Sequence, residues 1–201
     1  PLGPQNEPLC FYRVYQEWVR AAEQTGMKVA LFADGLNRSG DFPQGHKLTA
    51  DEWITALGGA IDNIPDSPAV WRVEGKKGLL HFATWNALPG ETAPDGQWAA
   101  KVMPALRRGR APFFFGADVK IHRENPADWR YAGDAVYDFS PAAPRAWLDI
   151  QQARYARESP VPYVWISSPG YYRRNWNDWT QPDFERIHES YQNAMKAGAR
   201  W

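Results

Sequence analysis

The chain contains the run Pro112-Phe113-Phe114-Phe115-Gly116-Ala117-Asp118, in which every residue between the proline and the aspartate is apolar or glycine. A short run that is apolar at successive positions predicts a strand buried on both faces, because a strand with one solvent-exposed face alternates apolar and polar residues. Strands of that kind are typical of parallel sheets. The closing aspartate lies where the strand opens into a loop.

Four further segments resemble this run and are predicted strands. They are residues 27–34, 79–84, 135–139 and 161–168. The segments around them have apolar residues at helical spacing, at 11–25, 49–61, 98–106, 144–156 and 183–197. In one of these, Thr49 is followed three residues later by Glu52, a capping-box pattern that marks the start of a helix. The alternation predicts a parallel sheet whose strands are joined by helices.

Two architectures fit such a sheet. An open, doubly wound sheet of five strands suits a chain of 201 residues, whereas a (β/α)8 TIM barrel usually needs about 250. Four of the five predicted strands end in a polar or aromatic residue, and none is followed by a glycine-rich phosphate turn. Because barrel enzymes place their chemistry on the loops after the carboxyl ends of the strands, we expect a TIM-barrel type of α/β fold. We expect about five βα units, incomplete as a barrel, in one domain of residues 1–201, with the open sheet as the alternative.

Composition excludes several classes of function. The chain has 23 basic and 23 acidic residues and no run of like charges, which argues against nucleic acid or an anionic membrane as partner. A single cysteine, Cys10, excludes an internal disulfide framework, and the four histidines lack metal-ligand spacing. No apolar stretch approaches the roughly 20 residues that span a bilayer. We therefore expect no metal and no membrane span, and from the start at Pro1 we expect a portion of a longer protein.

The chain has eleven tryptophans, and such rings either fill cores or stack on the flat faces of sugars. Trp18, Trp53, Trp98 and Trp147 lie among aliphatic residues at helical spacing, which predicts packing of helices on the sheet. Trp85 lies beyond the end of a predicted strand. For Trp85 we expect contact with a sugar.

The candidate substrate-binding residues lie at or beyond the carboxyl ends of the predicted strands. They are Asp34, Trp85, Asn86, Glu91, Asp118, Asp138 and Tyr171. A polar side chain in that position can reach a ligand bound over the sheet edge. The alternative for each aspartate is that it caps the next helix or fixes a loop.

The motif Ser168-Pro169-Gly170-Tyr171-Tyr172 comes directly after the last predicted strand. Apolar segments precede it in a fixed order, at residues 28–34, 79–82, 112–115 and 134–137. This succession resembles the central portion of the barrel in glycoside hydrolase family 71 and the related family 99, which are α-1,3-glucanases and endo-α-mannan hydrolases. The resemblance implies that the five strands are the third to seventh strands of the barrel.

The resemblance also implies a function. We expect a secreted glycosidase that hydrolyses an α-linked polysaccharide, an α-glucan or α-mannan, by acid/base chemistry without a cofactor, in an extracellular or periplasmic location. In these families the paired carboxylates lie near the eighth strand, so the catalytic acids are expected beyond Trp201. The alternatives are a non-catalytic carbohydrate-binding barrel and an open α/β domain that binds a small molecule. A barrel of five units would expose two strand edges, which predicts self-association or a complementary chain.

Overall fold

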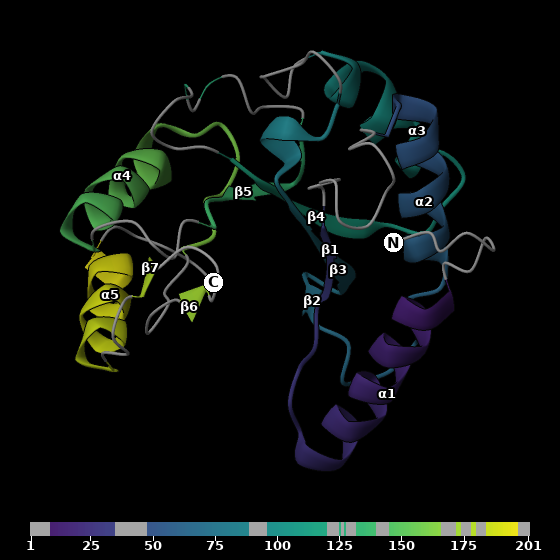
Figure 1. Cartoon of the computed structure of the whole chain (residues 1–201), viewed down its shortest axis with the longest axis horizontal. Coiled ribbons are helices and arrows are strands. Elements are labelled where there is room, and N and C mark those ends of the chain that lie inside the picture. The colour runs from purple at the N-terminus through teal and green to yellow at the C-terminus, as the bar shows by residue number, and fades with distance from the viewer. Residues whose placement is uncertain are drawn as a thin grey trace.

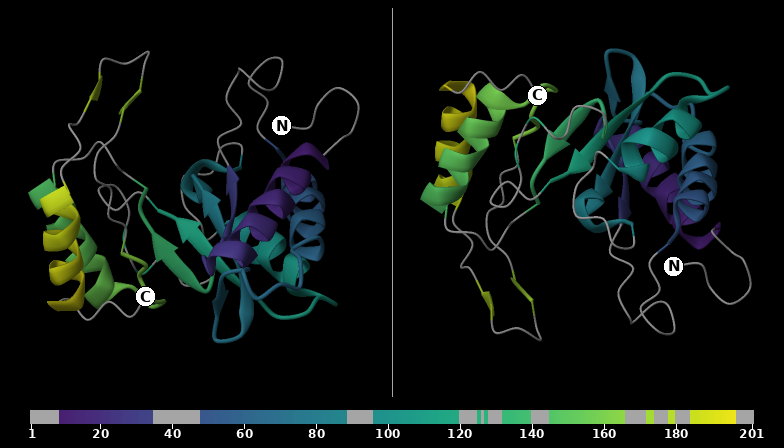
Figure 2. Two further views of the ribbon diagram at one scale, coloured as in Figure 1. Left: turned by 90° about the horizontal axis from the view of Figure 1, so that it is seen from below. Right: turned by 90° about the horizontal axis from the view of Figure 1, so that it is seen from above.

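The computed structural model of the chain describes residues 9–34, 48–88, 96–119, 125, 127, 132–139, 145–165, 172–173, 178–179 and 184–196. The helices are α1 (Leu9–Thr25), α2 (Ala50–Asp62), α3 (Met103–Arg107), α4 (Arg145–Glu158) and α5 (Phe184–Lys196), with a 3-10 turn η1 (Thr84–Asn86) and a π-helical turn η2 (Trp98–Val102). The strands are β1 (Leu31–Asp34), β2 (Arg72–Val73), β3 (Lys76–Phe82), β4 (Phe113–Asp118), β5 (Ala135–Tyr137), β6 (Tyr172–Arg173) and β7 (Asp178–Trp179). Figures 1 and 2 show α1, α2 and α3 grouped at one end of the central sheet and α4 and α5 at the other.

The central sheet is parallel and its strands follow the order of the chain. The order is β1-β3-β4-β5, and the short β2 pairs antiparallel with β3. A parallel bridge from Val136 to Tyr163 adds the next position beyond β5. A doubly wound sheet needs a point at which the strand order reverses, and the described strands contain none. Successive right-handed crossovers in one direction are the connectivity of a barrel.

The main hydrophobic core lies on one face of this sheet. Strand residues Leu79, Phe115 and Val136 belong to the same buried cluster as Trp53 of α2 and Trp98 of η2. Leu148 and Tyr155 of α4 belong to it as well. Helices that follow β1, β3 and β5 in the chain therefore cover one face, as helices do on the outside of a barrel.

The opposite face of the sheet is lined by the alternate residues of the same strands. Val73, Phe114 and Ala135 form a small separate cluster there, with Trp71 and Val164 packed against it. On this face Trp71 meets Phe114 edge to face, with ring centroids 5.6 Å apart. This face corresponds to the interior of a barrel, which is filled by side chains.

Most predicted elements are confirmed with shifted ends. Thr49 caps α2, and the reciprocal bonds with Glu52 that define a capping box are both present. Residues 27–30 precede β1, and within them Val29 forms a bridge with Val70. The predicted strand at 161–168 contains only the bridge at Tyr163 within its described residues.

The packing prediction for tryptophan is confirmed for Trp53 and Trp98 and is wrong for Trp18. Trp18 is 64% exposed on α1. The buried stripe of α1 is made by Tyr15, Val19 and Ala22, one position away from the stripe that would include Trp18. Trp147 of α4 is 37% exposed, so it packs only in part.

Gly78 in β3 lets the ring of Trp71 lie closer to the strand backbone than any side chain at position 78 would allow. A Cβ atom built there would lie 2.1 Å from Cε3 of Trp71, a rigid ring atom. We expect Gly78→Ala to lower the free energy of unfolding by about 2 kcal/mol, because the indole must move away from Phe114. Chemical denaturation measures this change.

Gly58 in α2 provides the matched control for that substitution. A Cβ atom there would lie 2.5 Å from Nη2 of Arg110, the end of a long side chain that pairs with Asp62. Because alanine favours a helix over glycine by about 1 kcal/mol, which offsets a weakened ion pair, Gly58→Ala should change stability less than Gly78→Ala does. Equal losses in the two variants would contradict the packing argument.

Candidate functional site

The carboxyl ends of the parallel strands lie along one edge of the sheet, which we call the carboxyl edge. In the strand register Asp34 is opposite Phe82, and Asp118 is opposite Tyr137. The 3-10 turn η1, with Trp85 and Asn86, follows β3 at the same edge. The strands therefore bring the predicted positions of Asp34, Trp85, Asn86, Asp118 and Asp138 to one edge, as a parallel sheet requires.

Asp118 is fully buried at this edge, with 0% exposure. Its Oδ2 accepts a hydrogen bond from the backbone N–H of Ala83 at 2.8 Å, and its Oδ1 accepts one from the N–H of Phe139 at 2.9 Å. The backbone N–H of Asp118 in turn donates to Thr84 Oγ1 at 3.1 Å. One carboxylate thus joins the ends of β3, β4 and β5. The contact of Asp118 with substrate stays a prediction.

Asp138 follows β5 and is also buried, with 1% exposure. It lies near Tyr163, whose hydroxyl donates to Gln152 Oε1 at 3.1 Å. Burial raises the pKa of Tyr163 well above its usual range, and the charges of Asp138 and Asp118 raise it further. The tyrosine therefore stays protonated as a donor, and contact of Asp138 with substrate stays a prediction.

His81 near the end of β3 and Thr84 at the start of η1 form a buried polar pair next to Asp118. Thr84 Oγ1 donates its proton to the carbonyl of His81 at 2.9 Å, so it accepts the bond of 2.8 Å from the Nδ1–H of the ring. The tautomer is thereby assigned with the proton on Nδ1, and Nε2 has no hydrogen-bond partner within the described part of the chain. Burial lowers the pKa of His81 to about 3, which makes it a neutral core residue.

Trp85 and Asn86 are half-buried in the turn after β3. The turn begins at Ala83, whose φ of 54° is in the left-handed region, and the N–H of Asn86 donates back to the Ala83 carbonyl at 2.9 Å. Trp85 packs partly against the main core. Both residues keep some exposed surface at the carboxyl edge, and their contact with substrate stays a prediction.

Three further predicted site residues cannot be placed in full. The side chain of Asp34 lies outside the part of the chain that the structure describes, although its backbone ends β1. Glu91 and Tyr171 lie outside the described residues altogether.

The structure also shows an aromatic cluster that the sequence reasoning missed: Phe32, Phe82 and Phe139. Phe32 lies in β1, Phe82 ends β3, and Phe139 is the second residue after β5. The ring centroids are 5.4 to 6.2 Å apart. Phe32 is 47% exposed and Phe139 is 37% exposed. An exposed aromatic patch at the carboxyl edge is a surface on which a flat apolar ligand face can stack.

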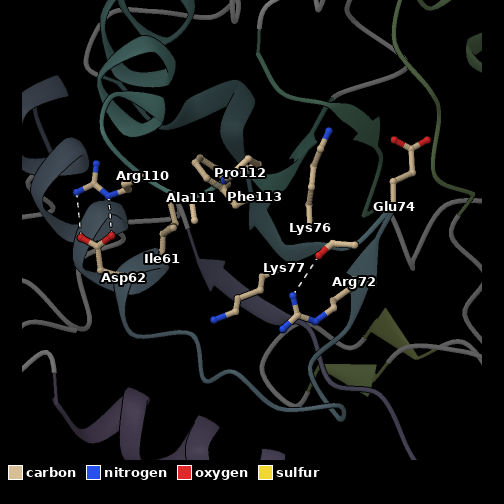
Figure 3. Close-up of a pocket in the computed structure, with 11 residues that line it drawn as sticks. Ile61, Asp62, Arg72, Glu74, Lys76, Lys77, Arg110, Ala111, Pro112 and Phe113 are labelled. Atoms are coloured by element: carbon tan, nitrogen blue, oxygen red, sulfur yellow. Dashed lines mark hydrogen bonds and ion pairs between the residues drawn. The ribbon is translucent and has the colours of Figure 1, made fainter.

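A pocket of about 680 Å³ lies at the opposite, amino edge of the strands (Figure 3). Arg110 in its wall binds both carboxylate oxygens of Asp62, at 2.8 and 3.1 Å. Lys77 donates to the carbonyl of Ile64 at 2.9 Å, and Lys76 points in a different direction from Lys77. The basic groups do not converge on one point, so the pocket lacks the geometry of an anion site.

Among the described ranges no group of three or more histidine, cysteine or acidic side chains could hold a metal ion. No helix in that part of the chain has the length and apolar character needed to cross a membrane.

The fold is similar to that of solved glycoside hydrolase structures. No family model matches the sequence, and no curated protein matches it. Two solved structures of the family 99 endo-α-mannosidase of Bacteroides thetaiotaomicron do match it, each at 18% identity over 92% of this chain. The TM-score is 0.65 for the complex with BIS-TRIS-propane and 0.66 for the second structure.

These matches cover 57% and 54% of the two endo-α-mannosidase chains, so this chain spans just over half of their length. At this identity the likeness concerns the fold. It agrees with the strand order and with helices on one face of the sheet. The chain therefore has the α/β-barrel fold of the family 99 endo-α-mannosidases, as the resemblance predicted, over the part of the barrel that it spans.

Proposed function

We propose that the chain is part of a glycoside hydrolase that acts on an α-linked polysaccharide, an α-mannan or an α-glucan. The observation that carries this proposal is the match of 92% of the chain to endo-α-mannosidase structures. The carboxyl edge supports it locally, because this is where barrel enzymes bind their substrates. The predicted contacts of Asp34, Trp85 and Asn86 belong to the proposal.

Hydrolysis of a glycosidic bond ordinarily needs two carboxyl groups that flank the bond, one protonated and one ionised. Asp118 and Asp138 are buried, and both oxygens of Asp118 accept backbone hydrogen bonds. We therefore assign the acid pair to other residues of the protein. In this proposal the chain contributes substrate contacts and the scaffold that positions them.

The test is release of reducing sugar from a panel of α-mannans and α-glucans by the full-length gene product. Activity on one of these classes supports the proposal and identifies the sugar. Binding without release of reducing ends would favour a carbohydrate-binding barrel without catalytic acids. If the protein neither binds nor cleaves any polysaccharide of the panel, both the glycosidase hypothesis and the carbohydrate-binding hypothesis are contradicted.

The aromatic cluster gives a binding prediction within this proposal. The π face of an exposed ring can pack against the apolar C–H face of a pyranose. We expect Phe32→Ala to weaken the binding of an oligosaccharide from the preferred polysaccharide about tenfold, through a loss of about 1–2 kcal/mol of apolar contact. Isothermal titration calorimetry measures the affinity.

Ile150 provides a control for this variant, because it is 65% exposed on α4, outside the aromatic cluster. Ile150→Ala removes a comparable exposed apolar side chain. It should bind the oligosaccharide with the affinity of the wild type. An unchanged affinity in Phe32→Ala would remove the aromatic cluster from the substrate site.

A further inference from the structure

The buried carboxylate of Asp118 accepts backbone hydrogen bonds from one residue of the aromatic cluster and from the residue that follows another. Oδ1 accepts the N–H of Phe139 itself at 2.9 Å. Oδ2 accepts the N–H of Ala83, the residue directly after Phe82, at 2.8 Å. The rings of Phe82 and Phe139 meet edge to face with centroids 5.4 Å apart. The same carboxylate therefore fixes the backbone beneath both rings.

The backbone at Ala83 needs such support. Its φ of 54° and ψ of 37° are left-handed, a conformation that an alanine adopts only when its surroundings impose it. Ala83 is fully buried. Asp118 holds its N–H, while the N–H of Asp118 donates to Thr84 Oγ1 on the next residue. Two bonds from one residue of β4 thus hold the start of the turn in a strained conformation.

Strained backbone that is fixed by buried hydrogen bonds occurs often at ligand sites, where it preorganises the groups that bind. A carboxylate suits this task because it is acceptor only, so each oxygen can take a backbone N–H from a different strand. Asparagine at the same position would turn an amide NH2 toward one of the two N–H groups.

We propose that Asp118 is a positioning residue, which sets the spacing and orientation of Phe82 and Phe139 as a preorganised platform for a pyranose ring. The use of the platform for a sugar rests on the proposed function. The positioning of the rings does not. The experiment therefore measures the two separately.

The ring arrangement is measured first, without ligand, by NMR contacts between the ring protons of Phe82 and Phe139. We expect Asp118→Asn to lose these contacts and to speed the hydrogen exchange of the Ala83 and Phe139 amides by about tenfold or more. Ala83→Gly keeps every hydrogen bond and removes the strain, because glycine adopts the left-handed conformation freely. It should keep the ring contacts, with a melting temperature equal to or above that of the wild type. The double variant Asp118→Asn/Ala83→Gly, whose turn is no longer strained, carries the test if Asp118→Asn alone does not fold.

Asp134 provides the matched control. Its Oδ2 also accepts a backbone N–H, that of Phe115 at 2.9 Å, but it lies before β5, away from the carboxyl edge, where its Oδ1 pairs with Arg107. Asp134→Asn should lower the melting temperature and keep the contacts between the two rings. Ring contacts that persist in Asp118→Asn or in the double variant Asp118→Asn/Ala83→Gly, or that are lost equally in Asp134→Asn, would overturn the proposal.

Oligosaccharide affinity is measured second, on the same variants. We expect a weakening of about tenfold in Asp118→Asn and no change in Ala83→Gly or in Asp134→Asn. If the wild type binds no oligosaccharide, the proposed function fails while the ring contacts still decide the role of Asp118. If the rings separate in Asp118→Asn but affinity is unchanged, the platform is overturned.

Discussion

Replacement of Trp98 by alanine is expected to lower the free energy of unfolding by about 4 kcal/mol. Trp98 is 1% exposed at the centre of the main core. Its ring stacks on His81 at a centroid distance of 4.9 Å and lies about 6 Å from the rings of Trp53 and Phe115. Its Nε1–H donates to the buried carbonyl of Ala132 at 3.1 Å. The variant loses the ring contacts, leaves a cavity and deprives a buried carbonyl of its donor.

Trp18 is the control for this substitution because it is the same residue type in an exposed position on α1. Trp18→Ala should change the free energy of unfolding by less than about 0.5 kcal/mol. Denaturation by urea, followed by circular dichroism, compares the two variants. A loss in Trp98→Ala that is no greater than the loss in Trp18→Ala would contradict the assignment of the core.

The sequence predicted those features of the fold that depend on neighbours along the chain. The capping box of Thr49 and Glu52 marks the start of α2, and the apolar run at 113–118 is β4. The alternation of these elements was sufficient to predict a parallel sheet joined by helices. It was not sufficient to choose between an open sheet and a barrel, because that choice depends on the order of strands in space.

The candidate site could be predicted only in outline. The residue type at the end of a strand is visible in the sequence, so the positions of Asp118 and Asp138 at the carboxyl edge were expected. Their burial was not expected, because it depends on which backbone N–H groups from other strands lie within reach. The aromatic cluster was missed because a run apolar on both faces does not show which face carries Phe32. One signal was available, namely a phenylalanine within two positions of the end of three predicted strands.

His81 makes the core sensitive to acid. The ring stacks on Trp98 at 4.9 Å and on Phe115 at 5.8 Å, meets Trp53 edge to face at 4.9 Å and donates from Nδ1 to Thr84. The described residues place no acceptor at Nε2, the atom that a second proton would occupy. A proton there would put an unpaired charge into an aromatic core, which is why burial lowers the pKa of His81 to about 3.

The folded protein therefore binds fewer protons at His81 than the unfolded chain does between pH 6.5 and about 3. Stability is fully present above pH 6.5 and is lost as the pH falls through this window. The slope from this one group approaches about 1.4 kcal/mol per pH unit, and the total over this window approaches about 5 kcal/mol. We expect His81→Phe to remove this slope, because phenylalanine does not titrate and still fits among aromatic rings.

The free energy of unfolding is measured against pH for the wild type and for His81→Phe. The difference between the two curves isolates His81, because the carboxylates are the same in both proteins. His81→Phe loses the bond to Thr84 Oγ1, so it should be the less stable protein at pH 7. Toward pH 4.5 the curves should converge and then cross. Parallel curves for wild type and His81→Phe would show that His81 is not the neutral core residue that its contacts indicate.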